Sequence, residues 1–265
     1  CSPILPMGLN EMAAKSSRDG AIRLQNAMHD TVREVGRVVK AEAIDCHFTQ
    51  GGYLSLCRSE MQLQRESDHT THLQSYGFTA DDYRMLSRSE ALERCGAAGV
   101  VGASFTPHCA VVHPARLARG LARVVEHMGA TIYARTRVTS TKPHSVRTEP
   151  GTAAADVVAR ATEAFTPALR GMRRAVAPIY SLMVATEPLP KSFWDQARLD
   201  ERSTFNDGRH MIIYGQRTTD DRIAFGGRGA RYHWGSKVRP EYDRNEGVHT
   251  LLHETLRELF PGLGD

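Results

Sequence analysis

The segment that decides the fold is HMIIYGQRTTDDRIAFGGRGARY, which runs from His210 to Tyr232. Two runs rich in β-branched and aromatic residues, Ile212–Tyr214 and Ile223–Phe225, flank the polar stretch Thr218–Asp221. Residues of the first kind favour a pleated, half-buried surface, whereas Thr and Asp at this position favour a turn. The segment therefore predicts a β-hairpin.

Glycines close the second strand of this hairpin, at Gly226, Gly227 and Gly229, with Arg228 among them. Because they lack a Cβ, they allow a ligand or another backbone to come close, and the planar fork of an Arg suits a carboxylate or phosphate. The same glycines fit a barrel corner or a bulge with a solvated Arg equally well. The hairpin alone leaves both interpretations open.

The whole chain has the composition of an ordinary globular protein, with 265 residues, 41% of them hydrophobic and 24% charged. No apolar run approaches the ~18 residues that a membrane span needs, and no secretory leader is visible, so we expect a cytoplasmic protein without a membrane span. The 34 basic and 30 acidic residues are interspersed. A nucleic-acid partner is not expected, because phosphate binding usually needs a basic stripe or patch.

The cysteines give one site hypothesis. The five thiols show no C-x-x-C spacing, so we expect reduced cysteines rather than a disulfide framework. Cys109 lies between His108 and His113, so a nucleophilic Cys/His pair is conceivable. The alternative is a hydrogen-bonded histidine at the end of a strand, since no geometry between nucleophile and base is visible in the sequence.

The histidines give a second hypothesis, a metal site. His69 and His72 are three residues apart and His249 and His253 are four apart, which is ligand spacing on a helix. Neither pair has a Glu in the H-E-x-x-H register. We therefore predict no metal site.

Hydrophobic periodicity predicts helices and strands along the whole chain. Helices are expected at Gly20–Ile44, Ser59–Ser75, Ser87–Cys95, Pro114–Met128, Pro167–Met172 and Val248–Leu259. Extended segments are expected at Tyr53–Cys57, Gly99–Val112, Ala130–Tyr133, Arg135–Ser140, Ser145–Thr148, Ala155–Ala161 and Ile179–Glu187. The fold class is α/β (α+β), because helices and strands alternate in the middle third while strands predominate from Ile179 onward.

Three further motifs accompany the hairpin. They are TPHCAVVHPARLARGLARVVEHMGATIYARTRV at Thr106–Val138, DVVARATEAFTPAL at Asp156–Leu169 and YSLMVATEPLP at Tyr180–Pro190. Together and in this order they resemble the FAD-dependent oxidoreductases of the D-amino-acid oxidase family, and within it the branch with glycine oxidase, sarcosine oxidase and gamma-glutamylputrescine oxidoreductase. The resemblance covers essentially the whole chain and implies an incomplete FAD-binding α/β domain interleaved with an antiparallel-sheet substrate domain.

The resemblance also implies domain boundaries. Residues 1–45, 111–175 and 240–265 would form part of the FAD-binding domain, and residues 46–110 and 176–239 the substrate domain. The family's G-x-G-x-x-G unit, which holds the FAD pyrophosphate on a helix N-terminus, does not occur in the chain. We therefore expect an internal fragment that retains FAD weakly or not at all on its own and is inactive alone.

The resemblance assigns residues to the cofactor. Those expected to contact FAD are Cys1, Ser2 and Pro3 near the isoalloxazine ring, Val138 on the adenine side, and Ala161 with Thr162 in a second dinucleotide-contacting stretch. Glu163 stands where many relatives have Gly or Asn, so it places a negative charge near the expected phosphates.

On the substrate side, Tyr214 and Arg228 match hairpin positions that face the flavin in relatives. A tyrosine hydroxyl can orient an amine or carboxylate, and an Arg can hold a carboxylate with two hydrogen bonds. The implied activity is oxidation of the CH-NH or CH-NH2 group of a small-molecule amine or amino acid, with FAD supplying the redox chemistry. The alternative is a flavin-free binding or interaction module derived from this fold. Neither the substrate, the electron acceptor nor the oligomeric state follows from the sequence.

Overall fold

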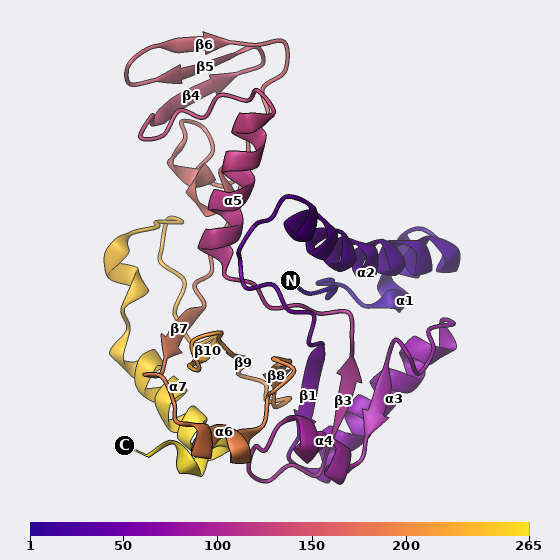
Figure 1. The fold of residues 1–265 in the computed structure, drawn as a ribbon. Helices are drawn as coiled ribbons and strands as arrows, with labels where there is room; N and C mark the ends of the chain where they lie inside the picture. The colour runs from indigo at the N-terminus through magenta and orange to yellow at the C-terminus, as the bar shows by residue number, and fades with distance from the viewer. Residues whose placement is uncertain (265) are drawn as a thin grey trace.

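The structure is a computed structural model that describes residues 1–264, and it shows a mixed α/β fold with two sheets (Figure 1). The helices are α1 Leu9–Lys15, α2 Arg18–Ala41, α3 Glu60–Ser75, α4 Arg88–Arg94, α5 Pro114–His127, α6 Lys191–Ala197 and α7 Glu246–Leu259, with the short helices η1 Glu163–Ala168, η2 Pro240–Asp243 and η3 Pro261–Leu263. The strands are β1 Tyr53–Cys57, β2 Arg84–Leu86, β3 Gly102–Thr106, β4 Val138–Lys142, β5 Ser145–Thr148, β6 Thr152–Ala154, β7 Leu182–Ala185, β8 Thr204–Asn206, β9 Ile213–Arg217 and β10 Ile223–Gly227. No helix within residues 1–264 combines the length and apolar character needed to cross a membrane.

The larger sheet has the strand order β2-β3-β1-β8-β9-β10-β7. Its pairs are antiparallel except for β1 and β8, which run parallel. The expected hairpin is confirmed, because β9 pairs with β10 in register, with Ile223 opposite Arg217 and Gly227 opposite Ile213. Since β8 pairs with both β1 and β9, two distant parts of the sequence form one continuous sheet.

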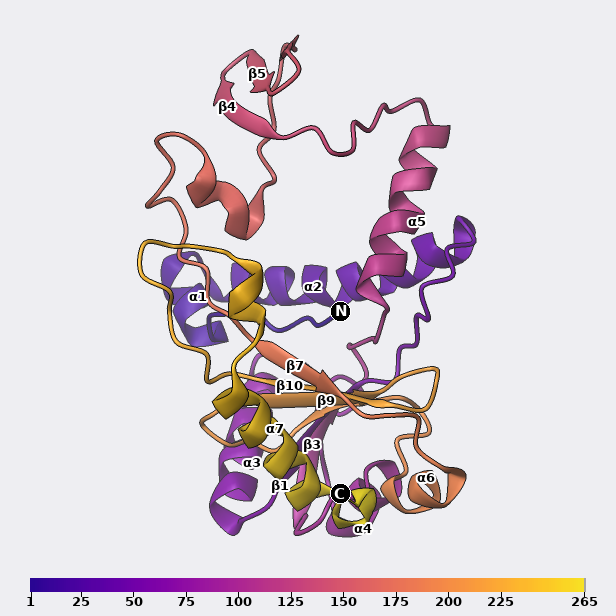
Figure 2. The same cartoon turned by 90° about the vertical axis from the view of Figure 1, so that its left-hand side faces the viewer.

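The two faces of this sheet differ in chemistry because side chains alternate along each strand. One face carries Leu54, Leu56, Phe205 and Phe225, all fully buried in the main core. Helices α4, α6 and α7 contribute to that core. Figure 2 shows the N-terminal end of the chain between α2 and the sheet. The face turned away from the core carries the candidate site.

Helix α7 belongs to the same core. Its buried residues Val248, Leu252, Leu256 and Leu259 recur at helical spacing and pack with the strands of the larger sheet. The expected assignment of residues 240–265 to the FAD-binding domain stays a prediction, as do the other domain boundaries.

The smaller sheet lies apart from the larger one, beyond α5 in Figure 1, and is the antiparallel meander β4-β5-β6. Two predictions in this region are wrong. Ala130–Tyr133 forms no strand, because within residues 1–264 no other segment pairs with it and its side chains are exposed. Residues 155–161 are not a strand either. Strand β6 ends at Ala154, opposite Ser145, the first residue of β5, so β5 offers no partner to the residues that follow.

Two predicted helices differ from expectation. In place of an α-helix at Pro167–Met172 the chain forms the 3-10 helix η1, which ends at Ala168. Helix α5 forms as predicted, with Pro114 in its first turn, but Leu121 and Val125 of its predicted apolar face remain partly exposed. Within residues 1–264, that side of α5 has no element packed over it, so the apolar stripe there is only half buried.

Candidate functional site

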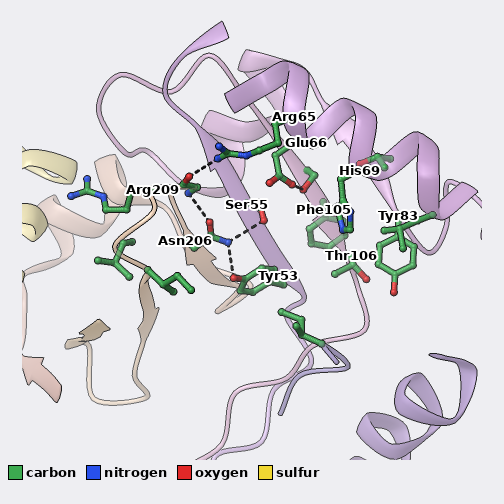
Figure 3. Close-up of a pocket in the computed structure, with 17 residues that line it drawn as sticks. Tyr53, Ser55, Arg65, Glu66, His69, Tyr83, Phe105, Thr106, Asn206 and Arg209 are labelled. Carbon is green, nitrogen blue, oxygen red and sulfur yellow. Dashed lines mark hydrogen bonds between the residues drawn. The ribbon is translucent and has the colours of Figure 1, made fainter. Parts of the chain in front are cut away.

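The candidate site is a cavity of about 370 Å³ between α3 and the polar face of the larger sheet (Figure 3). Its polar lining consists of Tyr53, Ser55, Arg65, Glu66, His69, Thr70, Tyr83, Ser104, Thr106, Asn206, Gly208 and Arg209. Its apolar lining consists of Ile4, Leu73, Phe105, Ile212 and Ile213. Apolar walls with a few convergent polar groups are the usual make-up of a site for a small molecule.

Strand register explains why hydroxyl and amide groups meet in this cavity. Ser55 pairs with Ser104 across one edge of β1 and with Asn206 across the other, so the three side chains point to the same face. The Asn206 amide donates to the Tyr53 hydroxyl at 2.6 Å and to Ser55 Oγ at 3.0 Å. Burial, with a smaller effect of nearby negative charge, raises the pKa of Tyr53, so its hydroxyl stays protonated.

Arg209 is bound to an acidic partner beside the cavity. Its Nε donates to both carboxylate oxygens of Asp207 at 2.8 Å, and Asp207 is only 2% exposed. Glu258 of α7 contacts both Arg209 and Arg58, which closes a network of four charges. The positive charge of Arg209 is therefore largely compensated within the protein.

A buried polar cluster lies at the Tyr83 side of the cavity. The Tyr83 hydroxyl is 2.7 Å from Nε2 of His29, and the Gln25 amide lies 3.2 Å from that nitrogen and from the hydroxyl. The same amide donates to the Pro3 carbonyl at 3.2 Å. Gln25 thus connects α2, the loop before β2 and the N-terminal segment.

A second histidine stacks on the first. The rings of His29 and His108 are 3.8 Å apart and within 10° of parallel, and His108 Nε2 donates to Asp82 Oδ1 at 2.8 Å. Burial, followed by the charge of His108, lowers the pKa of His29 to about 4. Burial opposes the charged carboxylate of Asp82, but hydrogen bonds from Thr79 and His108 outweigh it and lower the pKa of that carboxyl.

His29, Asp82 and His108 are the group within residues 1–264 whose ligand atoms lie close enough for a metal ion. The Nε2 atom of each histidine is already hydrogen-bonded within the protein, that of His29 to the Tyr83 hydroxyl and that of His108 to Asp82. The cluster is thus a hydrogen-bonded group in this structure, and the sequence-based expectation of no metal stays a prediction.

Cys109 does not form a nucleophilic pair. Its thiol donates to the Cys1 carbonyl at 3.0 Å and lies 3.4 Å from the Thr204 hydroxyl, whereas His108 is committed to Asp82. His113 accepts from the Arg116 amide as the N-cap of α5. Burial raises the pKa of Cys109, so the thiolate needed for nucleophilic attack is disfavoured.

The predicted cofactor segment at the N-terminus lies beside the extended segment that follows β3. The Cys1 amino group donates to the Ala110 carbonyl, and the Cys1 carbonyl accepts from the Ala110 amide at 2.9 Å. Cys1 and Ser2 are exposed while Pro3 is buried. Because Ile4 lines the cavity, the segment Cys1–Pro3 leads directly to its edge.

Tyr214 points to the polar face of the sheet, one strand beyond Asn206. Its hydroxyl is 2.9 Å from Ser181 Oγ, and a Cβ at Gly226 would lie 2.6 Å from its ring. The glycine at 226 therefore makes room for the Tyr214 ring. At Gly227 a Cβ would lie 2.8 Å from Leu252, so these two glycines serve protein packing rather than the approach of a ligand.

Arg228 follows directly after β10, and its backbone amide donates to the carbonyl of Ile212 at 2.9 Å. Ile212 lines the cavity, so the backbone of Arg228 lies at the cavity's edge. The side chain is exposed and makes no hydrogen bond or salt bridge with the residues that the structure describes. It is available for an anionic group.

The remaining predicted cofactor residues lie outside the cavity. Val138 begins β4 of the smaller sheet, and neither Ala161 nor Thr162 lines the cavity. Thr162 Oγ1 lies 2.8 Å from the Thr166 hydroxyl at the start of η1. The structure thus places Tyr214, the Arg228 backbone and the N-terminal segment near one sheet face, although none of them lines the cavity, and it places the other three residues elsewhere.

In the stretch Ala161–Glu163, the backbone conformation suits contact with an FAD phosphate, but the negative charge of Glu163 opposes it. Glu163 has a φ of 42°, a left-handed conformation that Gly or Asn adopts more readily. Its own carboxylate accepts the Ala164 amide hydrogen, the kind of donor that a phosphate oxygen would use. A phosphate can bind there only after the Glu163 side chain turns away. The segment Cys1–Pro3, in which Cys1 and Ser2 are exposed, carries no charged side chain that would compete with the cofactor.

Several residues in the cavity or next to it were not predicted as part of this site. Gln25 and His29 follow Ala21 and precede Val32 at helical spacing on the buried face of α2, a position that polarity alone does not reveal. Glu66 and His69 share a face of α3 with Leu73, so the i, i+3, i+7 spacing was the available signal. No local sequence signal pointed to Asn206, because its place at the cavity depends on the parallel pairing of β8 with β1.

Comparison with protein families gives one match over nearly the whole chain. Residues 10–265 match the family model DAO, described as FAD dependent oxidoreductase. A protein named probable oxidoreductase OrdL from Haemophilus influenzae is 23% identical over 230 residues, which cover 83% of this chain and 52% of that protein. A protein of the same name from Rhizobium meliloti is 25% identical over 260 residues, which cover 94% of this chain and 56% of that protein. The chain thus spans about half the length of these curated relatives.

Solved structures share the fold. Glycine oxidase from Geobacillus kaustophilus superposes with a TM-score of 0.66 at 22% identity, covering 99% of this chain and 65% of that one. L-proline dehydrogenase from P.horikoshii gives a TM-score of 0.66 at 17% identity, covering 88% of this chain and 62% of that one. At these identities the likeness is one of fold.

Proposed function

Because this chain belongs to the DAO family of FAD-dependent oxidoreductases, we propose that it forms the substrate side of an enzyme that oxidises the CH-NH or CH-NH2 group of a small-molecule amine or amino acid. The observation that carries the proposal is the cavity of about 370 Å³ on the polar face of the larger sheet. Hydroxyl, amide and charged groups line it on one side and apolar side chains on the other, which suits a small molecule with a polar head and an alkyl part. FAD, when bound, supplies the acceptor for the hydride that leaves the carbon next to nitrogen.

On the cofactor side, we propose that Cys1, Ser2 and Pro3 lie along the isoalloxazine ring. The support is local: the segment reaches the cavity through Ile4 and is fixed by Gln25 and by the Ala110 backbone. A fixed backbone beside the reacting centre restricts the orientation of cofactor and substrate, which is the main contribution a protein makes to such chemistry.

We assign lesser cofactor contacts to Val138, Ala161 and Thr162. The left-handed backbone of Glu163 supports a phosphate contact next to Thr162, provided that the Glu163 carboxylate releases the Ala164 amide. Replacing Glu163 by Gly should then strengthen FAD binding by the complete polypeptide, because it removes the negative charge and keeps the backbone conformation. Weaker FAD binding in Glu163→Gly would contradict this contact.

On the substrate side, Tyr214 and Arg228 are proposed to orient the reacting molecule. The Tyr214 ring is held over Gly226 and its hydroxyl beside Ser181, so the hydroxyl position is fixed in advance. The exposed guanidinium of Arg228 has the geometry to bind a carboxylate with two hydrogen bonds. These two residues would position substrate, and no side chain need act as an essential base.

The test is spectroscopic. The complete polypeptide that carries this chain should be isolated with flavin absorbance, and anaerobic addition of its amine substrate should bleach that absorbance. Arg228→Gln should lower kcat/KM for an amino acid by about ten- to a hundredfold and leave a plain amine unaffected, since charged hydrogen bonds contribute about 1.5–3 kcal/mol. Arg88→Gln, an exposed change on α4, serves as the control. A complete polypeptide without bound FAD would instead support the flavin-free binding module.

A further inference from the structure

Glu66 is the carboxylate that reaches into the cavity from α3. Its Oε2 accepts a hydrogen bond from Ser104 Oγ at 2.8 Å, which directs the side chain toward β3. Figure 3 shows it on the α3 side of the cavity, close to the strand that carries Ser55. The side chain is half-buried, so water screens its charge only in part.

This carboxylate forms no salt bridge with the residues that the structure describes, 1–264. The neighbouring Arg65 turns away and donates to the Gly208 carbonyl, and Arg209 is held by Asp207. Burial raises the pKa of the Cys57 thiol to about 12, and the charge of Glu66 adds to that effect across β1. The Glu66 carboxylate is half-buried, has one oxygen bound to a hydroxyl and has no cation of the described residues within 4 Å. Because buried charges are normally compensated, this carboxylate lacks a positively charged partner.

Position in the sheet separates Glu66 from Tyr214, which is proposed to orient the reacting amine and lies next to the cavity but not in its lining. Its partner Ser104 is on β3, whereas Tyr214 is on β9, and the order β3-β1-β8-β9 places three strand spacings between them. At about 4.8 Å per spacing this is roughly 14 Å of backbone separation. The side chains of Glu66 and Tyr214 shorten this separation but leave room between them for a substrate whose two nitrogens are several bonds apart.

Chemistry also argues that Glu66 is not the partner of the reacting nitrogen. A nearby negative charge favours the protonated form of an amine. Removal of hydride from the adjacent carbon requires the lone pair of the neutral amine, so a carboxylate at that nitrogen would oppose the reaction. A second nitrogen, which stays protonated throughout, has no such conflict.

We propose that Glu66 selects substrates that carry a second cationic nitrogen several bonds from the amine that is oxidised, such as a diamine or a basic amino acid. The proposal rests on the proposed function, because it takes Tyr214 and Arg228 to mark the reacting end. In the complex, the distal ammonium lies between the free oxygen of Glu66 and the hydroxyls of the polar sheet face, and the alkyl chain lies along the apolar side of the cavity at Ile4 and Ile212.

Calorimetric binding to the complete polypeptide tests this with pairs of ligands that differ in one charge. Putrescine and pentylamine have the same number of heavy atoms, and lysine and norleucine differ mainly in the terminal ammonium. Glu66→Gln keeps the side-chain length and can still accept from Ser104, so we expect putrescine and lysine to bind about ten- to a hundredfold more weakly. Pentylamine and norleucine should change less than about twofold. Glu60→Gln, an exposed change on the same helix, is the control and should alter no affinity.

Two further measurements sharpen the outcome. Glu66→Asp retains the charge and should retain the preference for the dication, and raising the salt concentration should weaken putrescine binding in the wild type more than in Glu66→Gln. Equal losses for pentylamine and putrescine in Glu66→Gln would show that Glu66 binds the reacting amine and overturn the proposal. No measurable binding of putrescine or lysine to the wild type would overturn it as well.

Failure of the proposed function has a different signature. If putrescine binding depends on Glu66 but no amine reduces the bound flavin, the cation site stands and the oxidase function falls. If amines are oxidised and Glu66→Gln leaves the preference for putrescine over pentylamine unchanged, the function stands and the cation site falls.

Discussion

His29 makes the stability of the protein sensitive to pH in the weakly acidic range. Its side chain is on α2, 2% exposed, with Tyr83 and Gln25 at its Nε2 and the ring of His108 against its face. Burial and the charge of His108 lower its pKa from 6.5 to about 4, while Asp82 acts in the opposite direction. The more distant Arg33 and Asp30 of α2 have small opposing effects.

The sign follows from linkage. Between pH 4 and 6.5 the ring is protonated in the unfolded chain and neutral in the folded protein, so the unfolded state binds more protons. The free energy of unfolding therefore falls as pH decreases through this window and is unaffected by His29 above it. One pKa unit corresponds to about 1.4 kcal/mol, so the lowered pKa removes about 2 kcal/mol by pH 5 and about 3 kcal/mol below pH 4.

Urea unfolding at pH 7.5 and at pH 5 measures this contribution. The wild type should lose about 2 kcal/mol more between the two conditions than His29→Gln, whose side chain cannot titrate. His253→Gln, an exposed change on α7, should behave as the wild type. An equal loss in the wild type and His29→Gln would refute the reasoning, as would an NMR titration of the His29 ring with a midpoint near 6.5.

Three further substitutions test packing and charge. Gly226→Ala should lower the free energy of unfolding by about 1–3 kcal/mol, because the new Cβ would lie 2.6 Å from the Tyr214 ring, and an unchanged urea midpoint would contradict that contact. Asp207→Ala should cost about 3–5 kcal/mol by leaving Arg209 without its buried partner, and a loss below about 1 kcal/mol would show that water compensates the guanidinium. Ser87→Ala should cost about 1 kcal/mol through loss of the capping box of α4, measured by thermal unfolding, and no change would mean that the cap is not needed there.

Local chemistry made much of the fold predictable. The caps Ser59 and Ser87 mark the starts of α3 and α4, and the polar run before Arg222 marks the turn of the hairpin. These signals act over a few residues, so the sequence contains them completely. Ala130–Tyr133 shows the limit: its residues have strand propensity, but a strand also needs a partner, and pairing depends on the whole fold.

The cavity could be predicted only in part for the same reason. The resemblance named Tyr214 and Arg228 because they lie in a motif that is continuous in sequence; they lie next to the cavity but not in its lining, and their roles stay predictions. Asn206 and Glu66 reach the cavity through β8 pairing with β1 and through α3 packing on β3, contacts between distant segments that no local pattern encodes. Gln25 and His29 were hidden because polar residues on the buried face of an amphipathic helix are rare.

The charged residues around the cavity differ in whether a protein group compensates their charge. Arg209 is compensated by Asp207, Arg65 is directed to a backbone carbonyl, and the lowered pKa of His29 keeps its ring neutral near pH 7. Arg209 and Arg65 are thus engaged by protein groups, whereas Glu66 forms no salt bridge with the residues that the structure describes. The charge of Glu66 favours a cation at the α3 side of the cavity. Arg228 does not line the cavity, but its backbone lies beside Ile212 at the edge, and its exposed side chain is proposed to bind a carboxylate. Under the proposals that Glu66 binds a second ammonium and that Arg228 binds a carboxylate, a basic amino acid would satisfy both residues.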